Sequence, residues 1–151
     1  MFHGREPLLQ NVHRFFGDSA TVIVEVPRGA CLKRDAQGRI DLISPVPAPF
    51  NYGRIEGLLG GDGEPLDAVI LGPRHPRGTC LTLPVRGVVY FVDGSSRDDK
   101  WVCAAKPLKR RDVALVKSFF RVYAFAKRIR DRLSGKPATS RFDGWHSAAV
   151  S

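Results

Sequence analysis

The sequence predicts an α+β fold in which a small β-barrel or sandwich carries one long helix on its outside. Short segments rich in β-branched residues alternate with Pro- and Gly-containing turns through the first two thirds of the chain, and a helical repeat of apolar residues follows them. With 151 residues, 43% of them hydrophobic, the chain can form one domain with its own core. We therefore expect a single domain over residues 1–151, beginning with an irregular segment at residues 1–19.

Four segments have the composition of β-strands and are separated by turn residues. They are residues 21–26, 66–71, 79–92 and 101–104. The third segment is interrupted at Pro84 and Gly87, which predicts either two strands or one bent strand. Residues 44–49 cannot be a central strand, because each proline in this stretch removes a backbone hydrogen-bond donor.

A helix is predicted over residues 112–134, with Asp112 as its N-cap and Gly135 as its stop signal. Its apolar residues recur at helical spacing, at Val113, Val116, Phe119, Phe120, Tyr123, Ala126, Ile129 and Leu133. Because an apolar stripe of this length must be covered, we expect the helix to pack along the β-rich body.

The charge balance favours anionic partners. The chain has 24 Lys and Arg against 15 Asp and Glu, a net charge of +9, and such a surface attracts nucleic acids, phosphorylated metabolites or acidic membranes without choosing among them. No apolar run approaches the roughly 20 residues of a membrane span, and the first residues lack an apolar signal core. The odd number of cysteines, Cys31, Cys80 and Cys103, indicates reduced thiols, so we expect a cytoplasmic protein.

Acidic residues gather in two turn-like segments, residues 61–67 and 93–100. They are Asp62, Glu64, Asp67, Asp93, Asp98 and Asp99. Carboxylates that are brought together repel one another unless cations neutralise them, and hard oxygen ligands suit Mg²⁺ or Mn²⁺. The alternative is that the Asp-Gly pairs simply form turns and their side chains face water.

A series of short motifs runs in order through residues 20–146. They are Glu25-Val26-Pro27, Lys33-Arg34-Asp35, Asn51-Tyr52-Gly53, Asp62-Gly63-Glu64-Pro65-Leu66-Asp67, the segment from Asp93 to Lys100, Phe119-Phe120-Arg121-Val122-Tyr123 and Gly144-Trp145. In this combination the chain resembles a divergent member of family I of the soluble inorganic pyrophosphatases. The resemblance implies a small OB-like five-stranded β-barrel with a long C-terminal helix packed outside, and a homo-oligomer.

The resemblance also implies a metal centre that holds Mg²⁺, or alternatively Mn²⁺. The metal ligands would be Asp62, Asp67, Asp93 and Asp98, with Glu25 and Asp35 as further acids lining the same cavity. Two such ions can activate a water molecule and clamp the attacking and leaving oxygens. The implied reaction is the Mg-dependent hydrolysis of inorganic pyrophosphate to two phosphates by a metal-activated water.

Two further groups of residues complete the implied site. Glu64 and Asp67 would be catalytic, with Glu64 deprotonating or orienting the attacking water. The phosphate groups would contact Lys33, Tyr52, Lys100 and Tyr123. Without the resemblance, tyrosines at these positions would be interpreted as ordinary core residues.

Three departures from the family pattern bear on activity. Glu64 replaces an aspartate, Leu42 stands where the family has a phosphate-binding arginine, and Ala124 stands where it has a lysine. Lys127 and Arg128 follow Ala124 by about one helical turn, so either could reach a similar place. The simpler interpretation is that both are solvated surface charges.

These departures leave several functions open. The protein could be a slow pyrophosphatase, could act on another phosphorylated molecule, or could be an inactive relative that binds an anionic ligand. Nucleic acid is one such ligand, because residues 100–141 contain 13 Lys and Arg against two acids. Against nucleic acid, no regular pattern of aromatic residues interleaves with these cations.

Overall fold

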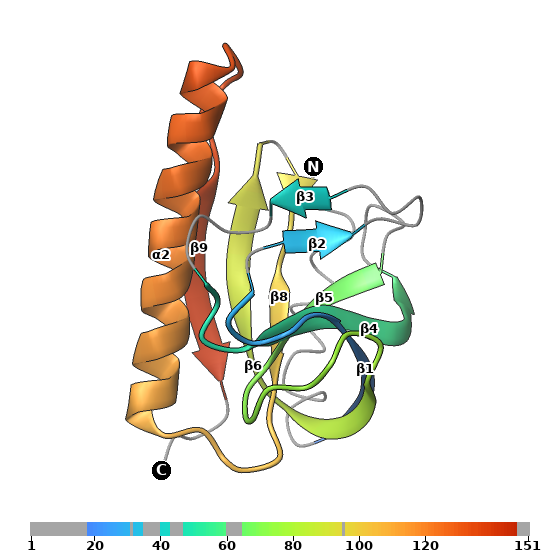
Figure 1. The fold of residues 1–151 in the computed structure, drawn as a ribbon. Helices are drawn as coiled ribbons and strands as arrows, with labels where there is room; N and C mark the ends of the chain where they lie inside the picture. The colour runs from blue at the N-terminus through green and yellow to red at the C-terminus, as the bar shows by residue number, and fades with distance from the viewer. Residues whose placement is uncertain are drawn as a thin grey trace.

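The protein is represented by a computed structural model that describes residues 18–30, 32–34, 40–42, 47–59, 65–94 and 96–147. Five strands close into a small barrel (Figure 1). In spatial order they are β1 (Ser19–Val26), β4 (Asn51–Leu59), β5 (Pro65–Ile70), β8 (Lys100–Cys103) and β6 (Cys80–Asp93). The barrel closes because β6 also pairs with β1, and all neighbours are antiparallel except β5 and β8. The predicted α+β fold with a five-stranded barrel is confirmed.

Outside the five barrel strands, the described residues include four further strands and one helix. The strands are β2 (Leu32–Arg34), β3 (Ile40–Leu42), β7 (Ser96–Arg97) and β9 (Arg141–Ser147), and the helix is α2 (Arg110–Leu133). Strand β9 extends the sheet beyond β6, and α2 runs beside β9 along the outside of the barrel (Figure 1). The described residues include no helix that is both long and apolar enough to cross a membrane.

The long β-rich segment is one bent strand. Strand β6 runs without interruption through Pro84 and Gly87, and its register against β8 shifts between Val85 and Gly87. Its first half pairs with β1, and its second half pairs with β8 and β9. The bend therefore allows a single strand to close the barrel at one end and support β9 and the helix at the other.

The helix begins two residues earlier than the sequence predicts. Its N-cap is Lys109, and Asp112 lies at the third helical position, where its carboxylate accepts a hydrogen bond from the Lys109 backbone N–H at 2.8 Å. The prediction of Asp112 as N-cap is therefore wrong, although its carboxylate still satisfies a free N–H group at the helix start. At the other end, Gly135 has a φ of 72° and the Lys136 N–H bonds back to the Asp131 carbonyl, which is a glycine-containing helix stop.

The helix covers one side of the barrel with part of its predicted apolar stripe. Val116, Phe120 and Ala124 are buried against barrel residues such as Phe50 and Phe91. The predicted stripe fails at its C-terminal end, where Ile129 is 40% and Leu133 is 85% exposed. Ile129 and Leu133 follow the buried Phe120 and Ala124 by nine positions each, which places them on the opposite side of the helix. The C-terminal end of α2 also projects past the strands of the barrel (Figure 1).

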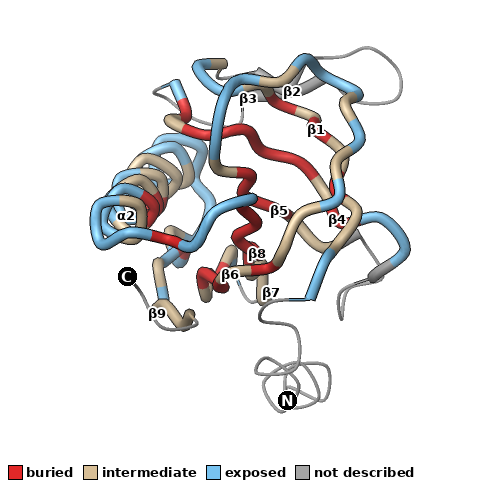
Figure 2. Tube along the Cα trace, turned by 90° about the horizontal axis from the view of Figure 1, so that it is seen from below, coloured by how far each residue is buried: buried red, intermediate tan, exposed pale blue. Residues whose placement is uncertain are grey.

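Two apolar clusters make up the described core. One lies between α2 and the barrel wall, and the other fills the barrel interior around β1, β5, β6 and β8. Figure 2 shows the buried stretches of these strands meeting at the centre, with exposed stretches around the rim. Apolar side chains therefore line the interior of the barrel.

Gly53 should tolerate no side chain, because a Cβ there would lie 1.8 Å from the Ile23 carbonyl oxygen of β1. We expect Gly53→Ala to lower the free energy of unfolding by about 2 kcal/mol or more, since the clash is with backbone that cannot move alone. Urea denaturation measures the loss. Gly87→Ala is the comparison, because the nearest atom to its Cβ would belong to the Trp145 ring, at 2.7 Å, and the nearest backbone atom would lie at 3.1 Å. A Gly53→Ala protein as stable as the original would contradict the close approach of β1 and β4.

Candidate active site

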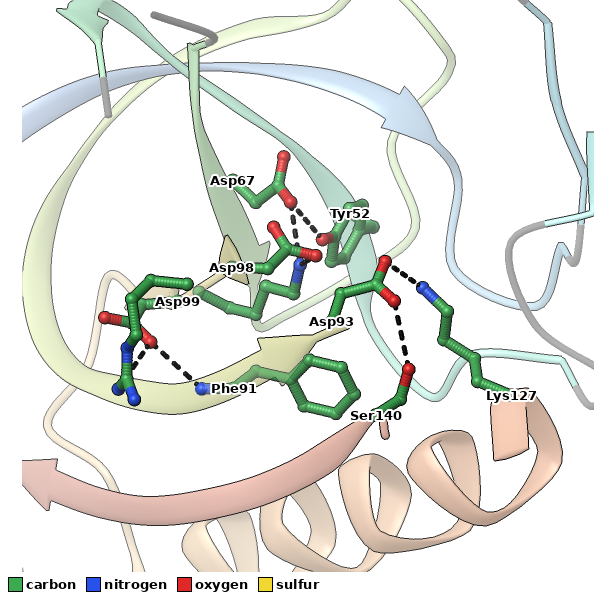
Figure 3. A network of polar contacts seen from close by, with 10 residues as sticks. Tyr52, Asp67, Phe91, Asp93, Asp98, Asp99, Lys127 and Ser140 are labelled. Carbon is green, nitrogen blue, oxygen red and sulfur yellow. Dashed lines mark hydrogen bonds and ion pairs between the residues drawn. The ribbon is translucent and has the colours of Figure 1, made fainter. Parts of the chain in front are cut away.

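A buried lysine joins two of the predicted acids. Asp67 on β5 and Lys100 at the start of β8 are paired across the parallel strands, and Asp98 lies just before β8. The Lys100 ammonium lies 2.8 Å from an oxygen of Asp67 and 2.7 Å from an oxygen of Asp98 (Figure 3). The Lys100 side chain is only 2% exposed, so its charge depends on these two carboxylates.

The ionisation of this trio follows from burial and mutual attraction. Burial alone would lower the pKa of Lys100, but Asp67 and Asp98 together raise it above its usual value. Burial works against the charge of Asp67 too, yet the ammonium and the hydroxyl of Tyr52 hold its pKa below the usual value. The pKa of Asp98 is raised, because burial and the nearby charge of Asp67 outweigh the attraction of Lys100. Asp67 is therefore the more strongly ionised carboxylate.

Tyr52 completes the trio from β4. Its hydroxyl donates a hydrogen bond of 2.8 Å to the same Asp67 oxygen that contacts Lys100 (Figure 3). Burial, followed by the charges of Asp67 and Asp98, raises the pKa of Tyr52 well above its usual value. The hydroxyl therefore stays protonated and can act only as a neutral donor or acceptor at neutral pH.

The two neighbours of Tyr52 explain its placement. The buried Asn51 side chain accepts hydrogen bonds from the backbone N–H groups of Arg28 and His75, and donates one to the Pro73 carbonyl at 2.8 Å. Gly53 allows β4 to lie close against β1. The Asn51-Tyr52-Gly53 motif thus anchors two loops, directs a hydroxyl toward Asp67 and brings two strands together.

Asp93, the third described acid of the predicted metal set, is held from the helix side. One of its oxygens contacts the Lys127 ammonium of α2 at 2.5 Å, and the other accepts a hydrogen bond of 3.0 Å from Ser140 (Figure 3). Burial opposes the charge on Asp93, but the contacts with Lys127 and Ser140 lower its pKa below the usual value. Asp93 is therefore ionised at neutral pH, with a lysine as its counter-ion.

Tyr123 lies beside this second ion pair. Its ring packs against Phe91, Phe119 and Phe120, with the ring centroids of Phe91 and Tyr123 5.5 Å apart. The Lys127 ammonium lies 5.3 Å from the centre of the same ring, a distance at which an aromatic face attracts a cation. Tyr123 is thus part of the aromatic cluster between α2 and the barrel, next to the Asp93–Lys127 pair.

The structure places six of the residues that the sequence singles out in two contact groups. Tyr52, Asp67, Asp98 and Lys100 form one contact group, and Asp93 and Tyr123 both contact Lys127. Asp35, Asp62 and Glu64 lie outside the described residues, and of Lys33 only the backbone in β2 is described. Glu25 is paired with Arg54 on the neighbouring strand at 3.3 Å.

Two residues of the site were not assigned by the sequence. The sequence offers Lys127 and Arg128 as two alternative replacements for the family lysine that is missing at Ala124. The structure distinguishes them, because Lys127 contacts Asp93. Arg128 instead donates a hydrogen bond to the Ser140 carbonyl and lies over the Phe125 ring. Ser140 carries no sequence signal, because it belongs to no motif and lies in the loop between α2 and β9. Its contact with Asp93 is visible only in the fold.

The carboxylates have the right chemistry for a divalent ion, but in the structure ammonium groups neutralise them. Hard carboxylate oxygens are the ligands that Mg²⁺ prefers, and Lys100 shows that a cation is held between Asp67 and Asp98. Among the described residues, no three acidic, histidine or cysteine side chains gather closely enough to hold a metal ion by themselves. The donor set therefore fits a divalent ion in kind, and the fourth predicted ligand, Asp62, lies outside the described part of the chain.

Comparison with known proteins gives the family. The family model for inorganic pyrophosphatase matches residues 22–148, which is most of the chain. The chain belongs to the inorganic pyrophosphatase family. The resemblance noted from its short motifs is thereby confirmed.

Individual pyrophosphatases support this assignment. The chain is 34% identical to the inorganic pyrophosphatase of Synechocystis over 107 residues, 64% of this chain and 61% of that protein. It is 39% identical to that of Haemophilus influenzae over 100 residues, 60% of this chain and 55% of that protein. The matched region thus spans a little over half the length of these curated relatives.

Solved pyrophosphatase structures share the fold. The inorganic pyrophosphatase of Neisseria gonorrhoeae superposes with a TM-score of 0.65 at 25% identity, covering 87% of this chain and 83% of that one. That of Thermus thermophilus superposes with a TM-score of 0.66 at 22% identity, covering 86% and 83%. These superpositions cover most of the chain, so its fold is shared with these solved pyrophosphatases.

Removing the buried lysine should destabilise the metal-free protein strongly. In Lys100→Met, Asp67 and Asp98 lose their shared counter-ion, and breaking such a buried pair costs about 3 kcal/mol. Urea denaturation in the presence of a chelator measures this loss. Lys117→Met, at a partly exposed position of α2, is the matched control and should change stability little. Equal stability of the two variants would contradict the role of Lys100.

Acid should remove the contribution of the Asp93–Lys127 pair. Because the folded pKa of Asp93 lies below its usual 3.8, the pair stabilises the fold above that pH and is lost as the pH falls through the folded value. We expect the difference in melting temperature between the original protein and Asp93→Asn to narrow as the pH falls from about 5 to about 2. Thermal melts in chelator measure it, and a difference that widens on acidification would contradict the ion pair.

Proposed function

We propose that the protein hydrolyses inorganic pyrophosphate to two phosphates, with Mg²⁺ as its cofactor. The family supports pyrophosphate as the substrate. The observation that carries the proposal is the convergence of Asp67, Asp98, Lys100 and Tyr52 from separate elements on one set of contacts. Such a group can bind both a divalent cation and a phosphate anion.

The carboxylates are proposed to bind the metal. Asp67, Asp93 and Asp98 would supply oxygen ligands together with Asp62, and the low pKa values of Asp67 and Asp93 keep these two groups ionised at neutral pH. A bound divalent ion supplies a Lewis acid that lowers the pKa of a coordinated water and offsets negative charge on phosphate oxygens. Mn²⁺ could take the same oxygen ligands.

The remaining side chains are proposed to position substrate and water. Lys100, with its raised pKa, stays charged, and Tyr52 stays protonated, so both can donate to phosphate oxygens. Tyr123 and Lys33 would add further phosphate contacts. Asp67, which is ionised, can accept a hydrogen bond from the attacking water, and Glu64 is proposed to share this role.

The family membership favours hydrolysis over the alternative of an inactive anion-binding protein. We further propose that copies of the chain associate. Among the described residues, α2 offers an exposed apolar surface for such contacts, formed by Leu115, Val122, Phe125, Ile129 and Leu133. Location in the cytoplasm stays a prediction of the cysteine content.

Phosphate release from pyrophosphate in the presence of Mg²⁺ tests the proposal. The original protein should release phosphate, and Asp67→Asn should lower kcat by about a hundredfold, because it disturbs both the ionised carboxylate and the groups around it. Glu56→Gln is the matched control, since the Glu56 side chain is 54% exposed and its ion-pair partner among the described residues is Arg54. It should leave the rate unchanged.

Two results would contradict the proposed hydrolysis or replace it with another function. If the original protein released no phosphate at any Mg²⁺ concentration, the proposed hydrolysis would be wrong. If in addition it bound single-stranded nucleic acid with an affinity that fell steeply with salt, the anion-binding alternative would replace it.

A further inference from the structure

The Asp93 carboxylate is occupied on both oxygens by groups that do not belong to the motifs of the family. Lys127 contacts one oxygen and the Ser140 hydroxyl donates to the other (Figure 3). Lys127 comes from α2 and Asp93 from the end of β6, so the contact bridges the helix and the barrel. Asp93 is also one of the proposed metal ligands, which means that a metal ion and the Lys127 ammonium would compete for the same oxygen.

The two lysines of the site differ in how firmly they are held. Lys100 is 2% exposed, contacts two carboxylates and lies near the ring faces of Tyr52 and Phe91. The Lys127 side chain is 13% exposed and has an ion-pair contact with one carboxylate, which is itself 40% exposed. Displacing Lys100 would leave two buried charges unpaired, whereas Lys127 can move toward solvent at much lower cost.

Resting on the proposed function, we propose that Lys127 is a displaceable counter-ion of Asp93 and a substrate-binding residue. It neutralises Asp93 before the metal binds, and a divalent ion at Asp93 releases its ammonium to contact a phosphate group of pyrophosphate. Lys127 thereby weakens metal binding in the absence of substrate. Once the metal is present, it makes substrate binding tighter.

The charges of the described site residues favour such an exchange. Asp67, Asp93 and Asp98 carry three negative charges at most, and Lys100 and Lys127 already supply two positive ones. A divalent ion beside both ammonium groups would be repelled, so the less firmly held ammonium moves away. Its four-carbon chain is flexible, and the Tyr123 ring face 5.3 Å away keeps the ammonium close to the site.

A calorimetric titration with Mn²⁺, without substrate, tests the first half of the proposal. Lys127→Met removes the competing ammonium while it keeps the aliphatic length of the side chain. Because a partly exposed ion pair contributes about 1 kcal/mol, we expect Mn²⁺ to bind about fivefold more tightly. Lys117→Met, the same substitution in the same helix, should bind Mn²⁺ like the original protein.

Binding of imidodiphosphate, a pyrophosphate analogue with a P–N–P bridge, tests the second half. At saturating Mn²⁺, Lys127→Met should bind the analogue about tenfold more weakly, because a charge-assisted hydrogen bond to a phosphate oxygen is lost. Lys127→Arg, which keeps the charge, should restore part of this affinity. If Lys127→Met does not fold, Lys127→Gln keeps a hydrogen-bond donor for Asp93 and should still bind Mn²⁺ more tightly than the original protein.

The outcomes separate this inference from the function on which it rests. If the original protein hydrolyses pyrophosphate but the neutral Lys127 variants bind Mn²⁺ no more tightly than it does, the inference is wrong and the function stands. Unchanged affinity for the analogue would likewise overturn the substrate contact. If the original protein neither binds Mn²⁺ nor releases phosphate, the proposed function fails and this inference fails with it.

Discussion

The rest of the site depends on one buried ammonium group, that of Lys100, held between the carboxylates of Asp67 and Asp98. A charge removed from water is tolerated only when opposite charges and hydrogen bonds replace its hydration. Lys100 meets this requirement through strand pairing, because parallel β5 and β8 place it directly opposite Asp67. The same pairing is one of the five that make up the barrel, so the architecture and the charge balance of the site depend on each other.

The outer helix contributes chemistry as well as cover. On its inner face, Phe120 packs against Phe50 and Phe91, and this aromatic contact fixes the position of α2 along the barrel. With the helix in that position, Lys127 reaches one carboxylate oxygen of Asp93. The loop that follows α2 brings the Ser140 hydroxyl to the other oxygen of Asp93. The apolar interface therefore positions a second ion pair beside the first, and the two pairs differ in burial and so in how easily a metal ion can disrupt them.

Much of this could be predicted from local pattern, and the failures have physical causes. The β-branched segments predict β1, β5, β6 and β8. They do not predict β4, because this strand contains two glycines and opens with a turn-like Asn-Tyr-Gly. They do not predict β9 either, because it lacks β-branched residues. The N-cap prediction fails at Asp112 because a carboxylate can accept a hydrogen bond from a free backbone N–H either at the N-cap or at the third helical position. Motifs identified Tyr52, Asp67, Asp98 and Lys100, whereas the pairing of Lys127 and Ser140 with Asp93 joins segments 34 and 47 residues apart that no local pattern connects.

The central proposal is that separate segments bring these carboxylates close to cations that neutralise them, and that the Lys127 ammonium gives way to a divalent ion while Lys100 stays in place. An anomalous-difference map from a crystal soaked in Mn²⁺ tests this most directly. We expect a peak beside Asp67, Asp93 and Asp98, with the Lys127 ammonium moved away from Asp93. A well-ordered crystal with no peak among these carboxylates, or with a peak beside them and the Asp93–Lys127 contact intact, would contradict it.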